Sequence, residues 1–357
     1  MARIMVMAGG TGGHVFPGLA LAEALKSHGV ETVWLGTKGG MEREWVEKAG
    51  LPFYEIPIRG LRGNGLLGWL KAPMKVAQAW WQARRLMKKL QPQLVLGMGG
   101  FVCGPGGLAA KSLGLPLVLH EQNAIPGLTN KLLAPLANRI ISAFPQQALR
   151  GEKVMLLGNP VRAGLESLPT VARRKPWHLL VLGGSRGALA LNTTLPKALA
   201  LLPEAQRPQV RHQTGEKTLQ EAREAYAEAG VQAEILAFID DMVEAYQQAD
   251  LVLCRSGALT VSELMAAARP AIMVPYPHAV DDHQTANAQA LVDLQGGEII
   301  QQNDLTPELL RDRLLVWGEE KRSVASDAIR QKAPTQASEK IVGVILEMLK
   351  NHCQQGA

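Results

Sequence analysis

Short apolar runs alternate with longer stretches of helical periodicity along the first half of the chain. An uninterrupted apolar run is typical of a strand buried on both faces, and a period near 3.6 residues is typical of an amphipathic helix. The pattern predicts strands at 3–8, 32–35, 53–56, 94–98 and 115–120. It predicts helices at 17–28, 41–49, 73–90, 106–113 and 129–136. Such alternation indicates a parallel sheet with right-handed crossovers.

The second half of the chain restarts with the pattern that opens the first half. Residues 5–14, MVMAGGTGGH, correspond to residues 180–189, LVLGGSRGAL. The matched positions are Gly9 with Gly183, Gly10 with Gly184, Gly13 with Gly187 and Thr11 with Ser185. In each copy a glycine turn would let the backbone approach a ligand, and the helix that follows would offer its N-terminus to an anion. The repeat predicts two nucleotide-type domains that face one cleft.

The later strands of the second half are predicted at 251–254 and 271–274. A short strand at 154–157 is followed by GNPVR at 158–162, which is typical of a domain crossover. We therefore predict an N-terminal domain at 1–162 and a C-terminal domain at 163–335. An amphipathic helix at about 336–357 is expected to pack back on the first domain.

The charge distribution says more than the net charge of +6. The segment 56–120 contains no acidic residue, and its basic residues are Arg59, Arg62, Lys71, Lys75, Arg84, Arg85, Lys88, Lys89 and Lys111. The rest of the chain has 29 basic and 32 acidic residues. One basic face therefore predicts an anionic partner, which could be a membrane, a nucleic acid or a phosphorylated substrate.

The composition excludes several classes of protein. Cys103, Cys254 and Cys353 lie far apart, which argues against a disulfide framework or a cysteine zinc site and favours a reducing compartment. The longest uncharged apolar stretch, 94–110, contains six glycines and a proline. We expect it to form a strand and a loop rather than a membrane span. No signal peptide is evident, so a cytoplasmic protein is expected.

Neither common nucleotide fingerprint is complete. The P-loop pattern is absent, which argues against a P-loop kinase or ATPase. A dinucleotide site needs a third glycine where Val15 stands, and an acidic residue after the second strand, which ends WLGT. NAD(P) binding is therefore not favoured. Two tight turns without a ligand remain an alternative.

His14 directly follows the first glycine loop, where a helix is expected to begin. A helix N-terminus disfavours an imidazolium, so the ring should stay neutral. A neutral imidazole in a cleft suits a general base. A capping or packing histidine is the alternative, and we favour the base.

Polar groups follow several of the predicted strands, where open α/β sheets bind ligands. In CRSGALTVSE at 254–263, Ser256 is expected to cap a helix whose free N–H groups could hold a diphosphate. Glu263 could accept both hydroxyls of a ribose, unless it is an ordinary solvated glutamate. HEQN at 120–123 and DDHQTAN at 281–287 add amides suited to sugars. Adjacent residues of the second cluster cannot all face one ion, so no metal site is predicted.

Eight motifs, in order, resemble those of glycosyltransferase family 28, in particular the bacterial N-acetylglucosaminyltransferases of peptidoglycan synthesis. They are GGTGGHVFPGLA from Gly9, GMGGFVCGPGGLAA from Gly97, HEQN from His120, GNPVR from Gly158, GGSRGA from Gly183, FIDDM from Phe238, CRSGALTVSE from Cys254 and DHQTANA from Asp282. They span nearly the whole chain. Arg186 departs from the glutamine that the family often has.

The resemblance implies a GT-B fold of two Rossmann-like, doubly wound domains separated by a deep cleft. It implies UDP-N-acetylglucosamine (UDP-GlcNAc) as donor, lipid I as acceptor, lipid II with an inverted β-1,4 linkage as product, and no metal or other cofactor. It places the protein peripherally on the cytoplasmic face of the bacterial plasma membrane. Other proteins of cell-wall synthesis and division are implied partners, and nucleic acid is not.

The resemblance also assigns roles to residues. His14 would be the catalytic base. The donor would be bound by Thr11, Gly12, Gly13, Asn123, Arg162, Ser185, Ile239, Ala258, Leu259, Thr260, Val261, Ser262, Glu263 and Gln284. Among these, Ser185 would contact phosphate, Ile239 would contact uracil through its backbone, and Gln284 would contact sugar hydroxyls.

The basic face includes the predicted helix 73–90, which starts with a proline at its expected first position. One face of this helix, formed by Val76, Trp80, Ala83, Met87 and Leu90, is expected to be core. The residues expected to contact a membrane are Leu66, Leu67 and Trp69 in a preceding loop, and Met74, Trp81, Arg85 and Lys88 on the helix. Each basic residue near an anionic leaflet contributes about 1 kcal/mol. The alternative is a solvated basic helix.

Two other functions stay open at this point. One is a different GT-B glycosyltransferase with a lipid or small-molecule acceptor. The other is a nucleic-acid-binding protein that uses the basic stretch, which would bind with strong salt dependence. The second leaves the glycine loops unexplained.

Overall fold

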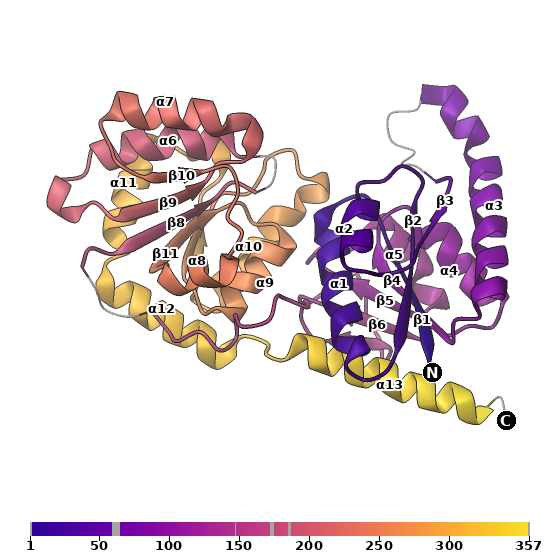
Figure 1. The fold of residues 1–357 in the computed structure, drawn as a ribbon. Coiled ribbons are helices and arrows are strands. Elements are labelled where there is room, and N and C mark those ends of the chain that lie inside the picture. The colour runs from indigo at the N-terminus through magenta and orange to yellow at the C-terminus, as the bar shows by residue number, and fades with distance from the viewer. Residues whose placement is uncertain (1, 59–64, 147, 172–174, 185–186, 356–357) are drawn as a thin grey trace. The chain divides into compact units, whose positions relative to one another are not determined.

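The computed structural model describes residues 2–58, 65–146, 148–171, 175–184 and 187–355, without the side chains of 65–72, 280 and 353–355. The chain forms two compact units (Figure 1). Unit 1 comprises Met1–Val161 and Gln336–Ala357, and unit 2 comprises Arg162–Thr335. Arg162, which the sequence analysis gave to the first domain, therefore belongs to unit 2.

Unit 1 is built on a parallel sheet that has seven strands in the described residues, in the order β3-β2-β1-β4-β5-β6-β7. The strands are β1 (Arg3–Ala8), β2 (Glu31–Thr37), β3 (Phe53–Ile56), β4 (Leu94–Gly99), β5 (Leu117–Glu121), β6 (Arg139–Ser142) and β7 (Val154–Leu156). The strand order reverses between β1 and β4. Open α/β sheets bind ligands outside the carboxyl ends of the strands at such a switch point.

Helices cover both faces of this sheet (Figure 1). One face packs against α1 (Gly12–Lys26), α2 (Glu42–Lys48) and α13 (Ala337–Gln355). The other packs against α3 (Gly65–Leu90), α4 (Cys103–Ser112) and α5 (Leu128–Leu133), which continues into the 3-10 turn η1 (Ala134–Leu136). Alternate residues of β1 serve the two faces: Ile4 and Val6 face α1, and Met5 and Met7 face α3 and α4.

Unit 2 repeats this architecture with six parallel strands in its described part, in the order β10-β9-β8-β11-β12-β13. The strands are β8 (His178–Leu182), β9 (Gln209–Gln213), β10 (Glu234–Leu236), β11 (Leu251–Cys254), β12 (Ala271–Met273) and β13 (Gly297–Ile299). Its switch point lies between β8 and β11. Both units thus have the Rossmann strand order, and the predicted fold class of two parallel-sheet α/β domains is confirmed.

The helices of unit 2 are α6 (Leu189–Ala200), α7 (Leu219–Ala229), α8 (Met242–Gln248), α9 (Ala258–Ala266), α10 (His283–Asp293), α11 (Pro307–Val316) and α12 (Glu319–Lys332). Short 3-10 turns occur at η2 (Glu204–Gln206), η3 (Glu216–Thr218), η4 (Val280–Asp282) and η5 (Gln302–Asp304). Residues of β8 pack with α6, α7 and α11 in the main core of the unit.

Two helices begin earlier than the sequence pattern predicts, because in both the proline taken as a start lies inside the helix. Helix α1 begins at Gly12 and contains Pro17, and α3 begins at Gly65 and contains Pro73. An internal proline removes one hydrogen bond, and the leucine, alanine and lysine residues before Pro73 favour helix. The expected loop at 66–69 is therefore wrong: its backbone is helical. The expected core face of α3 is confirmed.

The pattern misses β6, β9, β10 and β13 because their apolar runs are very short or are interrupted by polar residues. In β9, Arg211 and Gln213 alternate with apolar and aromatic positions, and His212 is fully buried. His212 Nδ1 lies 3.1 Å from the Tyr226 hydroxyl. Burial lowers the pKa of His212 from 6.5 to about 3.

Acid should therefore destabilise unit 2 through His212. Between pH 6.5 and about 3 the unfolded chain binds a proton that the folded chain does not, so stability present above pH 6.5 is lost as the pH falls. At pH 5 the loss from this residue is about 2 kcal/mol. In thermal melts, the drop in Tm from pH 7 to pH 5 should be smaller in His212→Gln than in the wild type. Equal drops in the two proteins would contradict this role.

Candidate functional site

The loops that follow β1 and β4 meet at the switch point of unit 1. A Cβ at Gly100 would collide with the carbonyl oxygen of Gly9, and both Gly99 and Gly100 have positive φ. The thiol of Cys103, in the first turn of α4, lies 3.2 Å from the carbonyl oxygen of Met7 and accepts the Gly99 N–H at 3.2 Å. Glycine at these positions lets the two backbones pack directly on one another, and this contact forms the surface against which the His14 ring packs.

His14 is the third residue of α1, so it lies in the first turn directly after the glycine loop. Thr11, Gly12 and Gly13 lie beside it, Thr11 as the N-cap residue. The ring packs against Gly99, where a Cβ would lie 2.7 Å from His14 Nδ1. Nδ1 lies 3.2 Å from Gln122 Oε1, within hydrogen-bond distance. Burial lowers the pKa of His14 to about 4, while the charge of Glu42 acts to raise it.

Glu42 is a site residue that the sequence analysis missed. Its carboxylate is almost completely buried and accepts the N–H of Thr37 at 2.8 Å, the Thr37 hydroxyl and the N–H of Gly10 at 3.4 Å. It thus joins the end of β2 to the glycine loop and places a negative charge near His14. A sequence feature that could have pointed to Glu42 is the glycine pair Gly39-Gly40 just before it. Glycine is needed at position 40 because a Cβ there would overlap the Glu42 carboxylate.

The HEQN segment lies at the end of β5, as predicted, and it is largely buried. The Glu121 carboxylate accepts the N–H groups of Asn123 and Gly127, each at 3.0 Å, and the Asn130 side-chain amide at 2.8 Å. Burial raises the pKa of Glu121, and these hydrogen bonds oppose the rise. Asn123 is partly buried, and its carbonyl accepts from Gln146 Nε2 at 2.6 Å. Glu121 therefore shapes the loop that carries Asn123.

In unit 2 the helix α9 starts at the carboxyl end of β11, beside the switch point. The expected N-cap was wrong: Gly257 is the N-cap, and no side chain caps the helix. Ser256 is fully buried instead, and its hydroxyl makes no hydrogen bond in the described part of the chain. The helix begins at Ala258, one residue later than expected, and Gly257 with its extended backbone is therefore the N-cap. The N-terminus of α9 is thus free of side-chain caps.

Glu263 lies in the second turn of α9 and is 5% exposed. Its carboxylate accepts from Arg162 Nε at 2.7 Å and from the Tyr246 hydroxyl at 3.2 Å. Burial raises the pKa of Glu263, and the Arg162 charge acts against this. Arg162, expected at the nucleotide, is therefore brought to Glu263, expected at the ribose. No sequence pattern pointed to Tyr246.

The remaining predicted donor residues lie at four places along unit 2. Ala258, Val261 and Ser262 are buried, whereas Leu259 and Thr260 are partly exposed on the first turn of α9. Ile239 is buried, and its N–H donates to Gln213 Oε1 at 3.2 Å. Gln284 in α10 accepts the Tyr276 N–H with its Oε1 at 2.9 Å. Its side-chain amide N–H groups are not used in this contact and could donate to a ligand. Ser185 and Arg186 lie outside the described residues.

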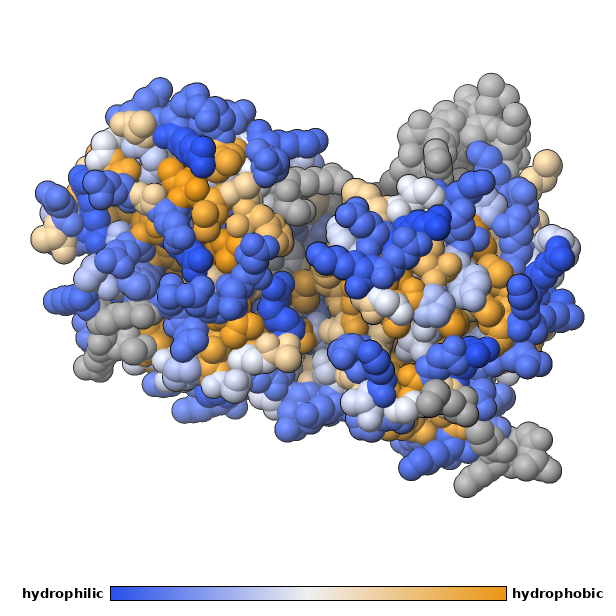
Figure 2. All heavy atoms as spheres, in the orientation of Figure 1, coloured by the Kyte–Doolittle hydropathy of each residue, from blue (hydrophilic) through white to orange (hydrophobic). Residues whose placement is uncertain are grey.

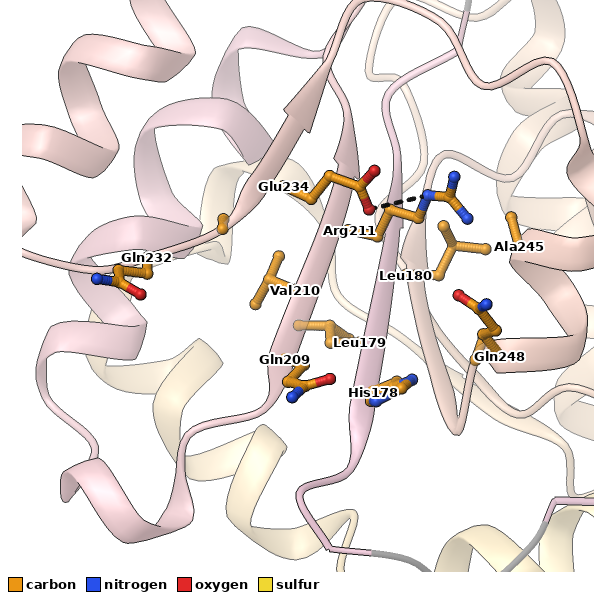
Figure 3. A pocket seen from close by; sticks show the side chains of 12 residues that line it. His178, Leu179, Leu180, Gln209, Val210, Arg211, Gln232, Glu234, Ala245 and Gln248 are labelled. Carbon is orange, nitrogen blue, oxygen red and sulfur yellow. Dashed lines mark ion pairs between the residues drawn. The ribbon is translucent and has the colours of Figure 1, made fainter.

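A cavity of about 450 Å³ opens elsewhere on unit 2. Figure 2 shows hydrophobic side chains gathered at the surface over β8, β9 and β10. Figure 3 shows the lining, which includes the ion pair of Arg211 with Glu234 at 3.1 Å and the side chains of Gln248 and His178. His178, Gln209 and Glu234 begin their strands, so this cavity lies at the amino ends of the sheet. None of the predicted site residues that the structure describes lines it.

Two further findings concern metals and membranes. Among the described residues, no cluster of three or more histidine, cysteine, aspartate or glutamate side chains is arranged to hold a metal ion. The absence of a metal or other cofactor stays a prediction. No helix in the described part of the chain is long and apolar enough to cross a membrane.

Comparison with known proteins decides the family. Residues 4–142 match the glycosyltransferase family 28 N-terminal domain, and residues 178–351 match the family 28 C-terminal domain. The chain belongs to glycosyltransferase family 28. It is therefore a glycosyltransferase, and the resemblance drawn from the eight motifs is confirmed.

The relatives in this family are similar over their full length. The chain is 68% identical, over 98% of both chains, to the UDP-N-acetylglucosamine–N-acetylmuramyl-(pentapeptide) pyrophosphoryl-undecaprenol N-acetylglucosamine transferase of Hydrogenovibrio crunogenus. It is 49% identical, over 97% of both chains, to the enzyme of the same name from Chromohalobacter salexigens. Among solved structures, Acinetobacter baumannii MurG has a TM-score of 0.84 and 38% identity, covering 97% of this chain and 100% of that one.

The contact of Gly99 with His14 gives a test of this family 28 site. In Gly99→Ala, the positive φ and the new Cβ at 2.7 Å from His14 Nδ1 should cost about 1–3 kcal/mol of stability and displace the ring. Thermal unfolding and transferase rates would measure both effects. Gly29→Ala is the control, since Gly29 has φ +71 but open space around it. Equal activity in the two variants would contradict the role of this contact.

Proposed function

We propose that the chain transfers GlcNAc from UDP-GlcNAc to the 4-hydroxyl of MurNAc in undecaprenyl-pyrophosphoryl-MurNAc-pentapeptide (lipid I), giving lipid II for peptidoglycan synthesis. The observation that carries this proposal is the 68% identity, over 98% of both chains, to a relative named for this reaction. A wider GT-B role with another acceptor is the alternative.

Donor binding is proposed for the carboxyl edge of the unit 2 sheet. The uncapped N-terminus of α9 offers N–H groups to the diphosphate. Glu263 already accepts from Arg162 and Tyr246, but each carboxylate oxygen has a second lone pair that can accept a ribose hydroxyl. Because the Ile239 N–H is donated to Gln213, its carbonyl oxygen is the group left to accept the uracil N–H. Gln284 would donate its amide N–H groups to the sugar.

Acceptor activation is proposed for the switch point of unit 1. The acceptor 4-hydroxyl forms a bond to the anomeric carbon while the bond from that carbon to the UDP oxygen breaks. UDP leaves with the electron pair, and the hydroxyl proton passes to His14. A single displacement of this kind inverts the anomeric centre and needs no covalent enzyme intermediate. The lowered pKa of His14 keeps the ring in its base form at neutral pH.

His14→Ala should lower turnover by at least about 100-fold, since general bases contribute about 100- to 10,000-fold. UDP affinity should hardly change, because the proposed nucleotide contacts lie in unit 2. Turnover would be measured as UDP release with a lipid I analogue, and affinity by calorimetry. His28→Ala, at the exposed C-terminal end of α1, is the control that should keep full activity. Wild-type turnover in His14→Ala would exclude this histidine as the base.

The same UDP-release assay tests the proposed function. Release should depend on both UDP-GlcNAc and the lipid I analogue. Release that requires a different acceptor would favour the wider GT-B alternative. Salt-dependent binding of DNA or RNA without any transfer would instead favour the nucleic-acid alternative.

We also propose that α3 binds an anionic membrane surface, at the cytoplasmic face of the plasma membrane. Met74 and Trp81 are 77% and 55% exposed, although both are large and apolar. The Arg85 guanidinium lies over the Trp81 ring at 5.6 Å, and Lys88 is exposed one turn further along. Exposed apolar side chains among cations suit an anionic leaflet. The side chains of Leu66, Leu67 and Trp69 lie outside the described residues.

Flotation with vesicles would test the membrane proposal. The wild type should float with phosphatidylglycerol-containing vesicles and less with neutral ones. Replacing Arg85 and Lys88 together by glutamate should weaken flotation, because two positive charges become negative and the surface loses four units of charge. The control replaces Lys197 and Lys217, two exposed lysines of unit 2, by glutamate. Equal binding to neutral and anionic vesicles would refute the electrostatic part.

A further inference from the structure

A continuous chain of hydrogen bonds runs behind His14 in unit 1. His14 Nδ1 lies 3.2 Å from Gln122 Oε1, and Gln122 Nε2 lies 2.9 Å from His120 Nδ1. His120 Nε2 lies 3.1 Å from the carbonyl oxygen of Gly158. His120 is fully buried and Gln122 is 2% exposed, so water does not compete for the contacts between these two side chains.

The far end of this chain fixes the protons along it. A carbonyl oxygen can only accept, so His120 Nε2 carries a proton and donates to Gly158. Burial lowers the pKa of His120 to about 4, and the ring is therefore neutral. Its Nδ1 then has a lone pair, which accepts an N–H from Gln122.

The orientation of the Gln122 amide follows from this. Its Nε2 faces two acceptors, His120 Nδ1 at 2.9 Å and the His120 carbonyl oxygen at 3.3 Å. A flipped amide would place its oxygen against both. Gln122 Oε1 must therefore point at His14, and an amide oxygen can only accept.

We infer that Gln122 and His120 are positioning residues that set the tautomer of His14: they hold the proton on Nδ1 and leave the lone pair on Nε2. This inference rests on the proposed role of His14 as the base. With its proton on Nδ1, the ring can take the acceptor proton only at Nε2. The resulting imidazolium keeps its bond to Gln122 Oε1, now charge-assisted, and the Glu42 charge stabilises it.

The direct test is the tautomer of His14, read from 15N shifts of histidine-labelled protein and assigned with His14→Ala. The wild type at pH 7.5 should show His14 protonated at Nδ1. In Gln122→Leu the acceptor is lost, and the signal should move toward the Nε2-protonated form. A wild-type ring protonated at Nε2 would overturn the inference, whatever the activity.

Kinetics give the second test. Gln122→Leu should lower kcat by about 10- to 100-fold, as expected for loss of an orienting contact, with KM for UDP-GlcNAc and the affinity for UDP unchanged. Gln93→Leu, at the amino end of β4, is the matched control and should change neither the tautomer nor kcat. An unchanged kcat in Gln122→Leu with a shifted tautomer would overturn the catalytic part.

A conservative pair at position 120 separates positioning from folding. His120→Asn keeps an oxygen where Gln122 Nε2 donates, and it should retain more kcat than His120→Leu, which removes that acceptor. Both variants should bind UDP with wild-type affinity if unit 2 is intact. Equal loss of kcat in the two variants would contradict the positioning role of His120. A wild type with the expected tautomer but no transfer to lipid I would refute the proposed function, and the inference about the tautomer of His14 would still hold.

Discussion

The close approach of two backbones at one edge of the unit 1 sheet is the constraint on which the site depends. Gly100 packs directly against the carbonyl of Gly9, and Gly99 leaves room for the ring of His14. These loops follow β1 and β4, the two strands on either side of the switch point. Because a side chain larger than hydrogen at either glycine would separate the loops, the motif around 97–100 serves the position of His14 rather than a ligand of its own.

Buried polar groups then hold this edge in place. Glu42 joins β2 to the glycine loop, and Glu121 joins β5 to the loop of Asn123. Each carboxylate is nearly inaccessible to water and is satisfied by several donors, which a buried charge requires. The neutral side chains of Gln122 and His120, which hydrogen-bond to each other, lie at the carboxyl end of β5. The proposed base therefore lies beside buried, hydrogen-bonded groups that come from several separate parts of the chain.

Unit 2 has the same strand order, and donor binding is proposed for its corresponding edge. Its corresponding edge carries groups that are already paired: Arg162 and Tyr246 with Glu263, Gln213 with the Ile239 N–H, and Gln284 with the Tyr276 N–H. A nucleotide sugar would therefore bind by sharing or replacing existing hydrogen bonds. Such groups are pre-oriented, so less conformational entropy is lost when the ligand binds. In the proposed function the two copies of the glycine loop therefore have different tasks.

The sequence alone determined the class of fold, the family and the position of His14 at a helix start. Apolar runs, glycine turns and motif spacing are local features, and a parallel α/β fold is encoded in their order along the chain. The sequence did not predict the true starts of α1 and α3, which lie before Pro17 and Pro73, nor the polar strand β9. In these segments the local sequence pattern conflicts with the tertiary packing, and the packing decides the structure. Only the tertiary structure revealed Glu42, Tyr246 and the contact of His120 with Gly158. Glu42 is 28 residues from His14, Tyr246 is 17 residues from Glu263, and Gly158 is 38 residues from His120. No local sequence pattern shows which distant polar groups will pair when they are buried.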